Sequence, residues 1–219
     1  MINACFLSEF AMVQEFEETF EKLYSDLFSR VLEFDSENGI ADIVLYKKKK
    51  NWEHSSTLGM INPRWAYTLR SLPYRKYFTI EEFQALTRTS SRSAKSTLTM
   101  FKEAGYCDIS NLSKKWIKHK QPMLLTNNVV AIEAKLSDWK RAVKQARRYQ
   151  DYANESWVLL EDKSKRAALK NIQYFEKANI GLATINIEGD IERHWSPSSQ
   201  APRSEFALWY MNAKLARDF

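Results

Sequence analysis

The sequence predicts an α/β protein into which a second, smaller domain is inserted. Three observations support this: strand-like and helix-like segments alternate after residue 122, a helix and a β-hairpin open the chain, and a strongly basic segment separates them. With 219 residues, the chain has room for one large domain that carries a smaller one. We expect the α/β domain at 1–59 and 121–219, and the insert at 60–120.

The N-terminal segment predicts a helix over 8–29 with Ser8 as its N-cap. A strand over 30–34, a polar turn at 35–39 and a strand over 40–46 follow, which together predict a hairpin. The apolar face of the helix is expected to consist of residues at helical spacing, namely Phe16, Phe20, Leu23, Tyr24 and Leu27.

The middle segment predicts three helices followed by two short strands. Thr79 and Glu82 have the spacing of a capping box, and Gly105 suits the end of a helix. This order of elements is typical of a winged helix-turn-helix. The helices are expected at 64–72, 79–86 and 91–104, and the strands at 106–109 and 116–118.

The segment after Pro122 predicts an α/β layer. Strands are expected at 128–135, 156–160, 180–187 and 191–195, and helices at 137–153, 165–178 and 204–219.

The charge of the chain is unevenly distributed. Residues 1–43 contain ten acids and two bases, a net charge of −8, whereas residues 44–219 have a net charge of +14. Residues 60–120 alone have a net charge of +8. This asymmetry indicates either a surface that binds a polyanion or a solvated basic surface, and the sequence leaves both open.

Composition excludes several classes of protein. Apolar residues make up 44% of the chain, enough for a core, which excludes a disordered chain. Two distant cysteines, Cys5 and Cys107, exclude a disulfide framework and favour a reducing cytoplasm. No apolar run is long enough for a membrane helix, no glycine-rich phosphate loop is present, and the three histidines have no ligand-like spacing.

Three ionisable residues fall within apolar strands: Asp42, Glu133 and Lys135. Side chains in a strand alternate between faces, so Glu133 and Lys135 project from one face, about 7 Å apart. Charges in such places are costly unless they pair or bind a metal, and carboxylate oxygens suit Mg²⁺. A structural ion pair, or strand-end charges in water, is the other interpretation.

The surrounding order resembles the PD-(D/E)XK nuclease superfamily, which has a restriction-endonuclease-like fold. The resemblance depends on Gly39-Ile-Ala-Asp42 and Ile132-Glu-Ala-Lys135, followed by a helix that carries Gln145 and Tyr149. The last two are similar to the QxxxY motif of one branch of that superfamily. Ala41 departs from the pattern, since it stands where the family name has proline.

The resemblance implies a mixed sheet flanked by helices and a nuclease site. Asp42 and Glu133, with the backbone carbonyl of Ala134, would hold Mg²⁺ or Mn²⁺. Lys135 would orient or deprotonate the attacking water, or stabilise charge on the phosphate. An acid of the first helix, namely Glu17, Glu18 or Glu21, would complete the site. The alternative is Glu33 on the first strand of the hairpin.

Exposed bases are expected to contact DNA, mainly through phosphates. The helix over 91–104 would enter the major groove and the following hairpin would form the wing. Tryptophans and tyrosines fall on predicted core faces, so the sequence predicts no base-stacking surface. The expected DNA-binding residues are Arg92, Lys95 and Lys102 on the helix, Lys114 and Lys115 on the wing, and Lys140, Lys144 and Arg148 beside the nuclease site.

The sequence therefore predicts a metal-dependent DNA endonuclease with DNA as its partner and no membrane association. The alternative is a DNA-binding protein whose nuclease-like part is structural or dimerising. Whether the chain forms a homodimer stays open.

Overall fold

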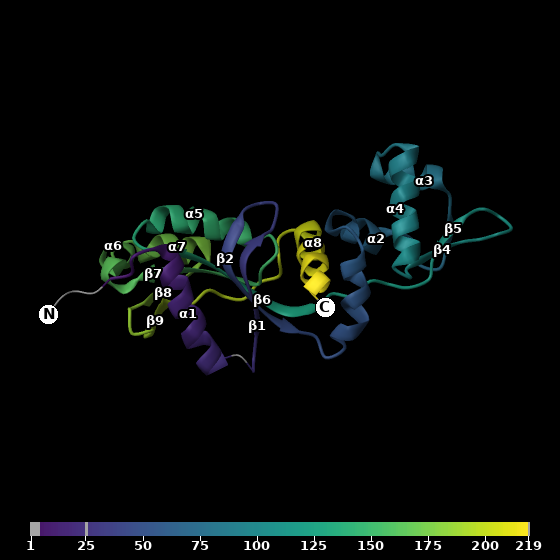
Figure 1. Cartoon of the computed structure of the whole chain (residues 1–219). Coiled ribbons are helices and arrows are strands. Elements are labelled where there is room, and N and C mark those ends of the chain that lie inside the picture. Colours follow the sequence, from purple (N-terminus) through teal and green to yellow (C-terminus); the bar gives the residue numbers. More distant parts are fainter. Residues whose placement is uncertain (1–4, 25, 219) are drawn as a thin grey trace. The chain divides into compact units, whose positions relative to one another are not determined.

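A computed structural model describes residues 5–24 and 26–218, and the chain divides into two compact units (Figure 1). The first unit comprises residues 1–48 and 127–204, and the second comprises residues 49–126 and 205–219. The second unit is wider than the expected insert of 60–120 and also includes the C-terminal helix.

The first unit is built on a mixed six-stranded sheet with the strand order β1-β2-β6-β7-β8-β9. β6, β7 and β8 run parallel, while the pairs β1–β2 and β8–β9 are antiparallel. The predicted α/β class is therefore confirmed. The strands are β1 (Ser29–Asp35), β2 (Ile40–Lys48), β6 (Thr126–Lys135), β7 (Glu155–Glu161), β8 (Gly181–Ile185) and β9 (Ile191–Trp195).

Helices cover both faces of this sheet. α1 (Glu9–Tyr24) packs Phe16 and Phe20 against a face that includes Ile132 and Ala134 of β6. Glu133 and Lys135 alternate with these residues and so belong to the opposite face. That face is covered by α5 (Trp139–Tyr149) and α7 (Ile172–Ala178), which lie side by side in Figure 1, while the short α6 (Lys165–Leu169) precedes α7.

α1 begins as the sequence predicts, because the Ser8 hydroxyl accepts a hydrogen bond from Ala11 N at 3.1 Å. Its predicted end is wrong: the helix stops at Tyr24, not at residue 29. Leu23 and Leu27, expected on the buried face, are exposed. The contacts with the sheet come instead from earlier in the helix, where Met12 and Val13 are buried together with Phe16 and Phe20.

A second difference concerns the helix expected over 165–178. The chain forms two helices there, separated at Lys170 and Asn171. The Asn171 side chain donates to the carbonyl of Ala167 at 2.9 Å, so it competes with the helical backbone for an acceptor.

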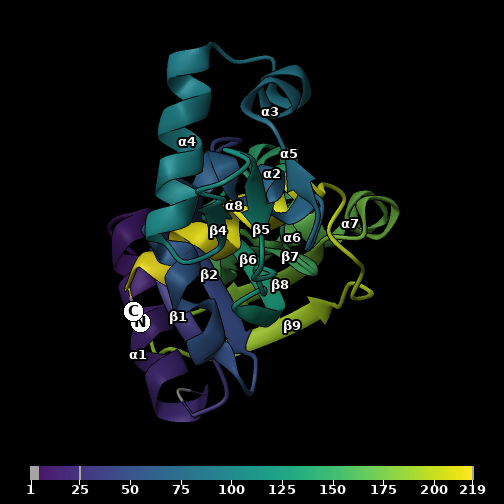
Figure 2. The same ribbon diagram turned by 90° about the vertical axis from the view of Figure 1, so that its right-hand side faces the viewer.

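The second unit combines helices with the small antiparallel sheet β3-β5-β4. Figure 2 shows α4 (Ser91–Glu103) as a long helix beside the shorter α3 (Ile80–Thr87). Thr79 and Glu82 form the predicted capping box at the start of α3. The other elements are α2 (Ala66–Ser71), β3 (Tyr77–Phe78), β4 (Cys107–Ile109), β5 (Trp116–Lys118), α8 (Glu205–Leu215) and the 3₁₀ turns Trp52–Met60, Pro63–Trp65 and Ala216–Asp218.

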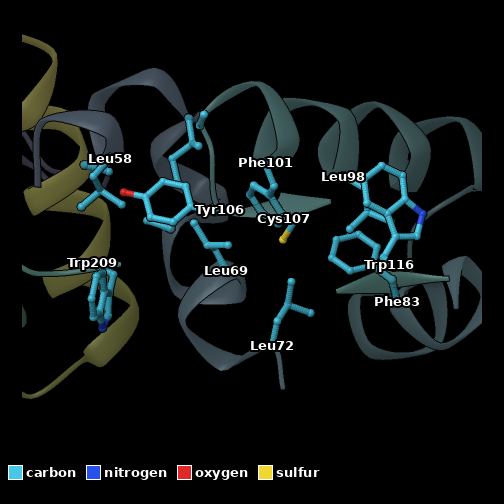
Figure 3. Close-up of a cluster of buried hydrophobic side chains, with 14 of the residues drawn as sticks. Leu58, Leu69, Leu72, Phe83, Leu98, Phe101, Tyr106, Cys107, Trp116 and Trp209 are labelled. Carbon is cyan, nitrogen blue, oxygen red and sulfur yellow. The ribbon is translucent and has the colours of Figure 1, made fainter. Parts of the chain in front are cut away.

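One hydrophobic cluster explains why the C-terminal helix belongs to this unit (Figure 3). Trp209 and Ala213 of α8 are buried in the same cluster as Leu58 and Leu69. Gly59 lies so close to the backbone of Ala216 that a side chain would not fit there. From the sequence we expected the helix over 204–219 in the α/β domain, because a contact between segments so far apart in the chain leaves no local sequence pattern.

A buried lysine holds part of the second unit together. Lys118 is fully buried, and its Nζ donates to Leu69 O at 3.0 Å, Arg70 O at 3.1 Å and Gln121 Oε1 at 3.1 Å. The first two acceptors are carbonyls of the last turn of α2, which lack helical partners. Lys118 therefore links the end of α2 to β5.

Among the described residues, four tyrosines depart from the expectation that tyrosines fall on core faces: Tyr67, Tyr74, Tyr77 and Tyr174 are exposed. Tyr74 and Tyr77 lie on either side of Arg75 and Lys76, which are exposed too. Their neighbours Leu72 and Phe78 are buried, so the chain turns outward only between these two points.

Among the residues that the structure describes, no helix is long and apolar enough to cross a membrane.

The buried Lys118 predicts how stability depends on pH. Burial lowers the pKa of Lys118 from 10.5 to about 8. Between these values the folded protein holds a neutral amine while the unfolded chain is still protonated, so the unfolded state binds more protons. Relative to Lys118→Met, the wild type should gain stability as pH rises from 8 to 10.5, by at most about 1.4 kcal/mol per pH unit. Urea unfolding of both proteins across this range measures the difference, and parallel pH profiles would contradict it.

Candidate active site

Asp42, Glu133 and Lys135 meet on the neighbouring strands β2 and β6. The Lys135 Nζ lies 2.9 Å from Glu133 Oε1 and 3.8 Å from Asp42 Oδ2, and it donates to Ala134 O at 2.8 Å. Asp42 Oδ2 accepts a hydrogen bond from Ala134 N at 2.7 Å. The three residues that the sequence selected therefore form one cluster around an ammonium group.

A third carboxylate completes the cluster, and it comes from Glu9. Glu9 Oε2 lies 3.1 Å from the Lys135 Nζ. Glu9 is the first residue of α1, where the N-terminal end of the helix favours a negative side chain. Its position at the helix start, one residue after the Ser8 cap, is the signal that sequence analysis overlooked.

The acids that the sequence proposed from this helix lie elsewhere. Glu17 and Glu21 both pair with Arg30. Glu18 is exposed and stands nine residues beyond Glu9, which corresponds to about 13 Å along the helix axis. The structure thus brings Glu9 to Lys135 and does not bring Glu18 there.

Glu33, the proposed rival, lies on β1 opposite Asp42. On either side of Glu33, Leu32 pairs with Ile43 and Phe34 pairs with Ala41. Glu33 itself has a φ of +46°, a left-handed conformation that non-glycine residues rarely adopt. The Glu33 charge acts on Asp42, whose pKa it helps to raise. Glu33 is exposed, and it lies beside the cluster.

Tyr149 of α5 supports the cluster from the covered face of the sheet. Its buried hydroxyl contacts Glu133 Oε2 and lies 2.6 Å from the carbonyl oxygen of Ile40. Asp138 fixes the start of α5, since its side chain accepts a hydrogen bond from Arg141 N at 3.0 Å. Tyr149 therefore ties α5 to β6 and to the strand that carries Asp42.

Gln145 lies one helical turn before Tyr149, on the same face of α5. Its Oε1 atom is buried and has no hydrogen-bond partner among the described residues. A buried acceptor without a donor is unfavourable, so this amide suits a water molecule or a bound ligand.

Exposure of the cluster increases from Glu133 toward Glu9. The side chains are 1% exposed for Glu133, 10% for Lys135, 30% for Asp42 and 46% for Glu9. The inner end is thus closed by protein, whereas the Asp42 and Glu9 carboxylates are open to solvent. A ligand would approach from this open side.

The environment shifts the pKa of each inner group. Burial raises the pKa of Asp42 and of Glu133, while hydrogen bonds from Ala134 N and from Tyr149 act in the opposite direction. For Lys135, burial acts to lower the pKa, but Glu133, Asp42 and Glu9 together outweigh it and raise the pKa. We therefore assign Lys135 as an ammonium ion at neutral pH, with Glu133 ionised beside it because the two groups stabilise each other's charge.

The donor set suits a hard divalent cation in chemistry and in charge. Three carboxylates surround a single ammonium, which leaves an excess of negative charge, and oxygen ligands are those that Mg²⁺ prefers. Within the described ranges, no three acidic, histidine or cysteine side chains converge closely enough to hold a metal as they stand. Asp42, Glu133 and the Ala134 carbonyl now face the Lys135 Nζ, which occupies the position between them.

The predicted DNA-binding residues are on the protein surface. In the first unit they lie on the exposed side of α5. The Arg148 guanidinium packs against Gly39, and its central carbon lies 3.5 Å from the position that a Cβ atom at residue 39 would occupy. In the second unit they lie on α4 and in the β4–β5 loop. The Lys102 Nζ lies 3.4 Å from Asp108 Oδ1. The exposed residues are Lys140, Lys144 and Arg148 on α5, Arg92, Lys95 and Lys102 on α4, and Lys114 and Lys115 in the loop.

A cavity of about 950 Å³ in the first unit lies away from this cluster. It is lined by Phe16 and Phe20 of α1 and by Ile132 and Trp157 of the sheet, so it opens on the face opposite to Glu133. The candidate site instead lies where β6 ends beside β2, with the side chains of Asp42 and Glu9 open to solvent.

Comparison of the chain with protein-family models, curated proteins and solved structures finds no match.

Removal of the Tyr149 hydroxyl should weaken the first unit. Tyr149→Phe removes the single hydroxyl proton for which Ile40 O and Glu133 Oε2 compete, and the loss of this hydrogen bond costs about 1–3 kcal/mol in the free energy of unfolding. Urea denaturation followed by tryptophan fluorescence measures the change. Tyr174→Phe is the control, because Tyr174 is exposed. Equal stability of the two variants would contradict the role assigned to Tyr149.

Proposed function

We propose that this protein is a metal-dependent phosphodiesterase that hydrolyses DNA. The observation that supports it most is the meeting of Asp42, Glu133 and Lys135 on adjacent strands, with Glu9 on the open side. A structural ion pair needs one acid for one lysine. Here three acids from three elements surround a single lysine, two of them open to solvent.

In this proposal Asp42, Glu133 and the Ala134 carbonyl hold Mg²⁺ or Mn²⁺, and Glu9 holds it from the open side. The ion would polarise a phosphodiester oxygen and lower the pKa of an attacking water. Lys135 stabilises the negative charge that develops on the phosphate and orients the water. The raised pKa of Lys135 favours these two roles over that of a general base.

The shape and charge around the cluster support a polymeric substrate. The site lies at the end of β6 with Asp42 and Glu9 open to solvent, which suits a nucleic acid strand that passes across it. The exposed bases Lys140, Lys144 and Arg148 lie on α5, the helix that also carries Tyr149 to the cluster. Phosphates on either side of the scissile bond are the natural partners of these side chains.

We propose that the second unit binds the DNA as a winged helix-turn-helix. Its support is the packing of α3 against α4, with the Phe83 and Phe101 rings 6.3 Å apart, and the β4–β5 hairpin that follows α4. In this arrangement Arg92 and Lys95 on α4 contact the duplex, and Lys114 and Lys115 lie on the wing.

The alternative is a DNA-binding protein without nuclease activity. One observation favours it: the Lys135 Nζ now fills the space among the carboxylates, as it would in a purely structural ion cluster. Dependence of cleavage on a metal ion and on the cluster separates the two functions.

The first test is DNA cleavage with Mg²⁺ or Mn²⁺. Single-stranded, double-stranded and four-way branched DNA are the substrates, with EDTA as the metal-free condition. Asp42→Asn and Lys135→Met should each lower the cleavage rate at least about 100-fold, because each removes a charge that acts on the transition state. Glu9→Gln should also lower the rate. Glu18→Gln, on the same helix but far from Lys135, is the matched control. If no substrate is cut, or if Asp42→Asn and Lys135→Met cut as fast as wild type, the assigned site is wrong.

The second test concerns duplex binding by α4. The double variant Arg92→Glu/Lys95→Glu should bind a 20-base-pair duplex more weakly in EDTA. The slope of log affinity against log salt concentration should fall in magnitude by about 2, since two phosphate contacts are lost. Fluorescence anisotropy between 50 and 300 mM salt measures it. Lys177→Glu, an exposed change in the first unit, is the control. An unchanged slope in the double variant would remove α4 from the interface.

A further inference from the structure

A short exposed segment of the second unit combines aromatic and basic side chains. It consists of Tyr74, Arg75, Lys76 and Tyr77, follows α2 and ends at the first residue of β3, and is called the YRKY segment below. Tyr74 is 39% exposed and Tyr77 is 59% exposed. Arg75 and Lys76 between them are also exposed. Single exposed apolar residues are common on protein surfaces, but two aromatic rings and two cations within four residues form a surface that is both aromatic and basic.

The segment is held in place from the protein interior. Leu72 before it and Phe78 after it are buried in the core of the second unit. Arg75 N donates to Lys118 O at 2.8 Å, and Tyr74 forms an isolated β-bridge with Lys118. The buried Lys118 ammonium also holds the end of α2, so Lys118 fixes the N-terminal side of the segment. At the other end, Tyr77 pairs with Ile117 of β5.

The backbone within the segment has one unusual residue. Arg75 has a φ of +56°, in the left-handed region, and the hydrogen bond from its N–H to Lys118 O fixes it there. The Arg75 guanidinium lies 5.1 Å from the centre of the Tyr74 ring. The tyrosine and arginine therefore form a cation–π pair on the surface.

The charge of this part of the chain is entirely positive. From His54 to Ile80 the sequence contains no aspartate or glutamate, while Arg64, Arg70, Arg75 and Lys76 lie within it. Exposed aromatic rings on either side of two cations, with no acid in this stretch of the sequence, suit a ligand that offers flat apolar faces and negative charges in alternation. A single nucleic acid strand has this chemistry, because its bases are stacking surfaces and its phosphates are anions.

We propose that the YRKY segment binds unpaired bases of single-stranded nucleic acid. Tyr74 and Tyr77 stack on bases, and Arg75 and Lys76 neutralise the adjacent phosphates. Duplex DNA keeps its bases stacked on one another, so the segment discriminates in favour of strands with unpaired nucleotides. The polymer class is taken from the proposed function, on which this inference rests in part. The residues involved are separate from both the acidic cluster and α4.

The experiment measures binding of the full-length protein to labelled 20-nucleotide DNA by fluorescence anisotropy. EDTA is present, so the result does not depend on nuclease activity. Three probes are compared: oligo(dT), an abasic strand of the same length, and a blunt duplex. The abasic strand keeps the phosphates but has no bases to stack. Wild type should bind oligo(dT) at least about tenfold more tightly than the abasic strand.

The variants separate stacking from charge. Tyr74→Ala and Tyr77→Ala should each weaken oligo(dT) binding by about tenfold and leave abasic binding within about twofold. Tyr74→Phe and Tyr77→Phe keep the rings and should bind as wild type. Lys76→Glu should weaken binding to both single strands. Tyr174→Ala, an exposed tyrosine of the first unit, is the matched control, and circular dichroism verifies that every variant is folded.

Two results would overturn the proposal. One is oligo(dT) binding by both alanine variants as tight as that of wild type. The other is equal affinity of wild type for the oligo(dT) and abasic strands, which would indicate phosphate contacts alone. Failure of the nuclease is a separate outcome, because it is read from cleavage with metal and from Asp42→Asn. A chain that binds oligo(dT) through Tyr74 and Tyr77 but cuts no DNA would keep this inference and lose the proposed function.

Discussion

The Lys135 ammonium is the interaction on which the candidate site depends. It lies within hydrogen-bonding or ion-pairing distance of carboxylates from α1, β2 and β6, and it donates to the carbonyl of Ala134. Without this positive charge, Glu133 would be a buried anion with only Tyr149 to stabilise it. One lysine therefore allows three acids to be held near one another, and their combined charge exceeds its own. That excess is what makes the cluster a candidate for cation binding.

The sheet explains why these groups meet. Glu133 and Lys135 share a face because the strand repeats every two residues, and Ala134 between them turns its N–H to Asp42 on the neighbouring strand. α5 then covers the same face and brings Tyr149 to Glu133. The inner end of the cluster is closed by these contacts, whereas the carboxylates of Asp42 and Glu9 stay accessible. A rigid base with an open side is an arrangement suited to chemistry on a large substrate.

A second buried lysine organises the other unit in a different way. Among the described residues, no carboxylate accepts a hydrogen bond from the Lys118 ammonium; two backbone carbonyls and one side-chain amide oxygen do. Its role is structural, because it links the end of α2 to β5 and supports the exposed YRKY segment. The contrast follows from the partners. Neutral acceptors satisfy an ammonium without excess charge, whereas the acids around Lys135 leave charge for a ligand to neutralise.

The sequence by itself determined the α/β class, the capping of α1 and α3, and the choice of Asp42, Glu133 and Lys135, because these depend on periodicity and local spacing. It did not determine which acid of the first helix reaches Lys135. Glu9 differs from Glu17, Glu18 and Glu21 in sequence only by its place beside the Ser8 cap, and the position of α1 relative to the sheet decides that Glu9 lies at Lys135. The membership of α8 in the second unit and the exposure of Tyr74 and Tyr77 were likewise decided by tertiary packing. Burial depends on contacts between residues far apart in the chain, and a local pattern carries no record of them.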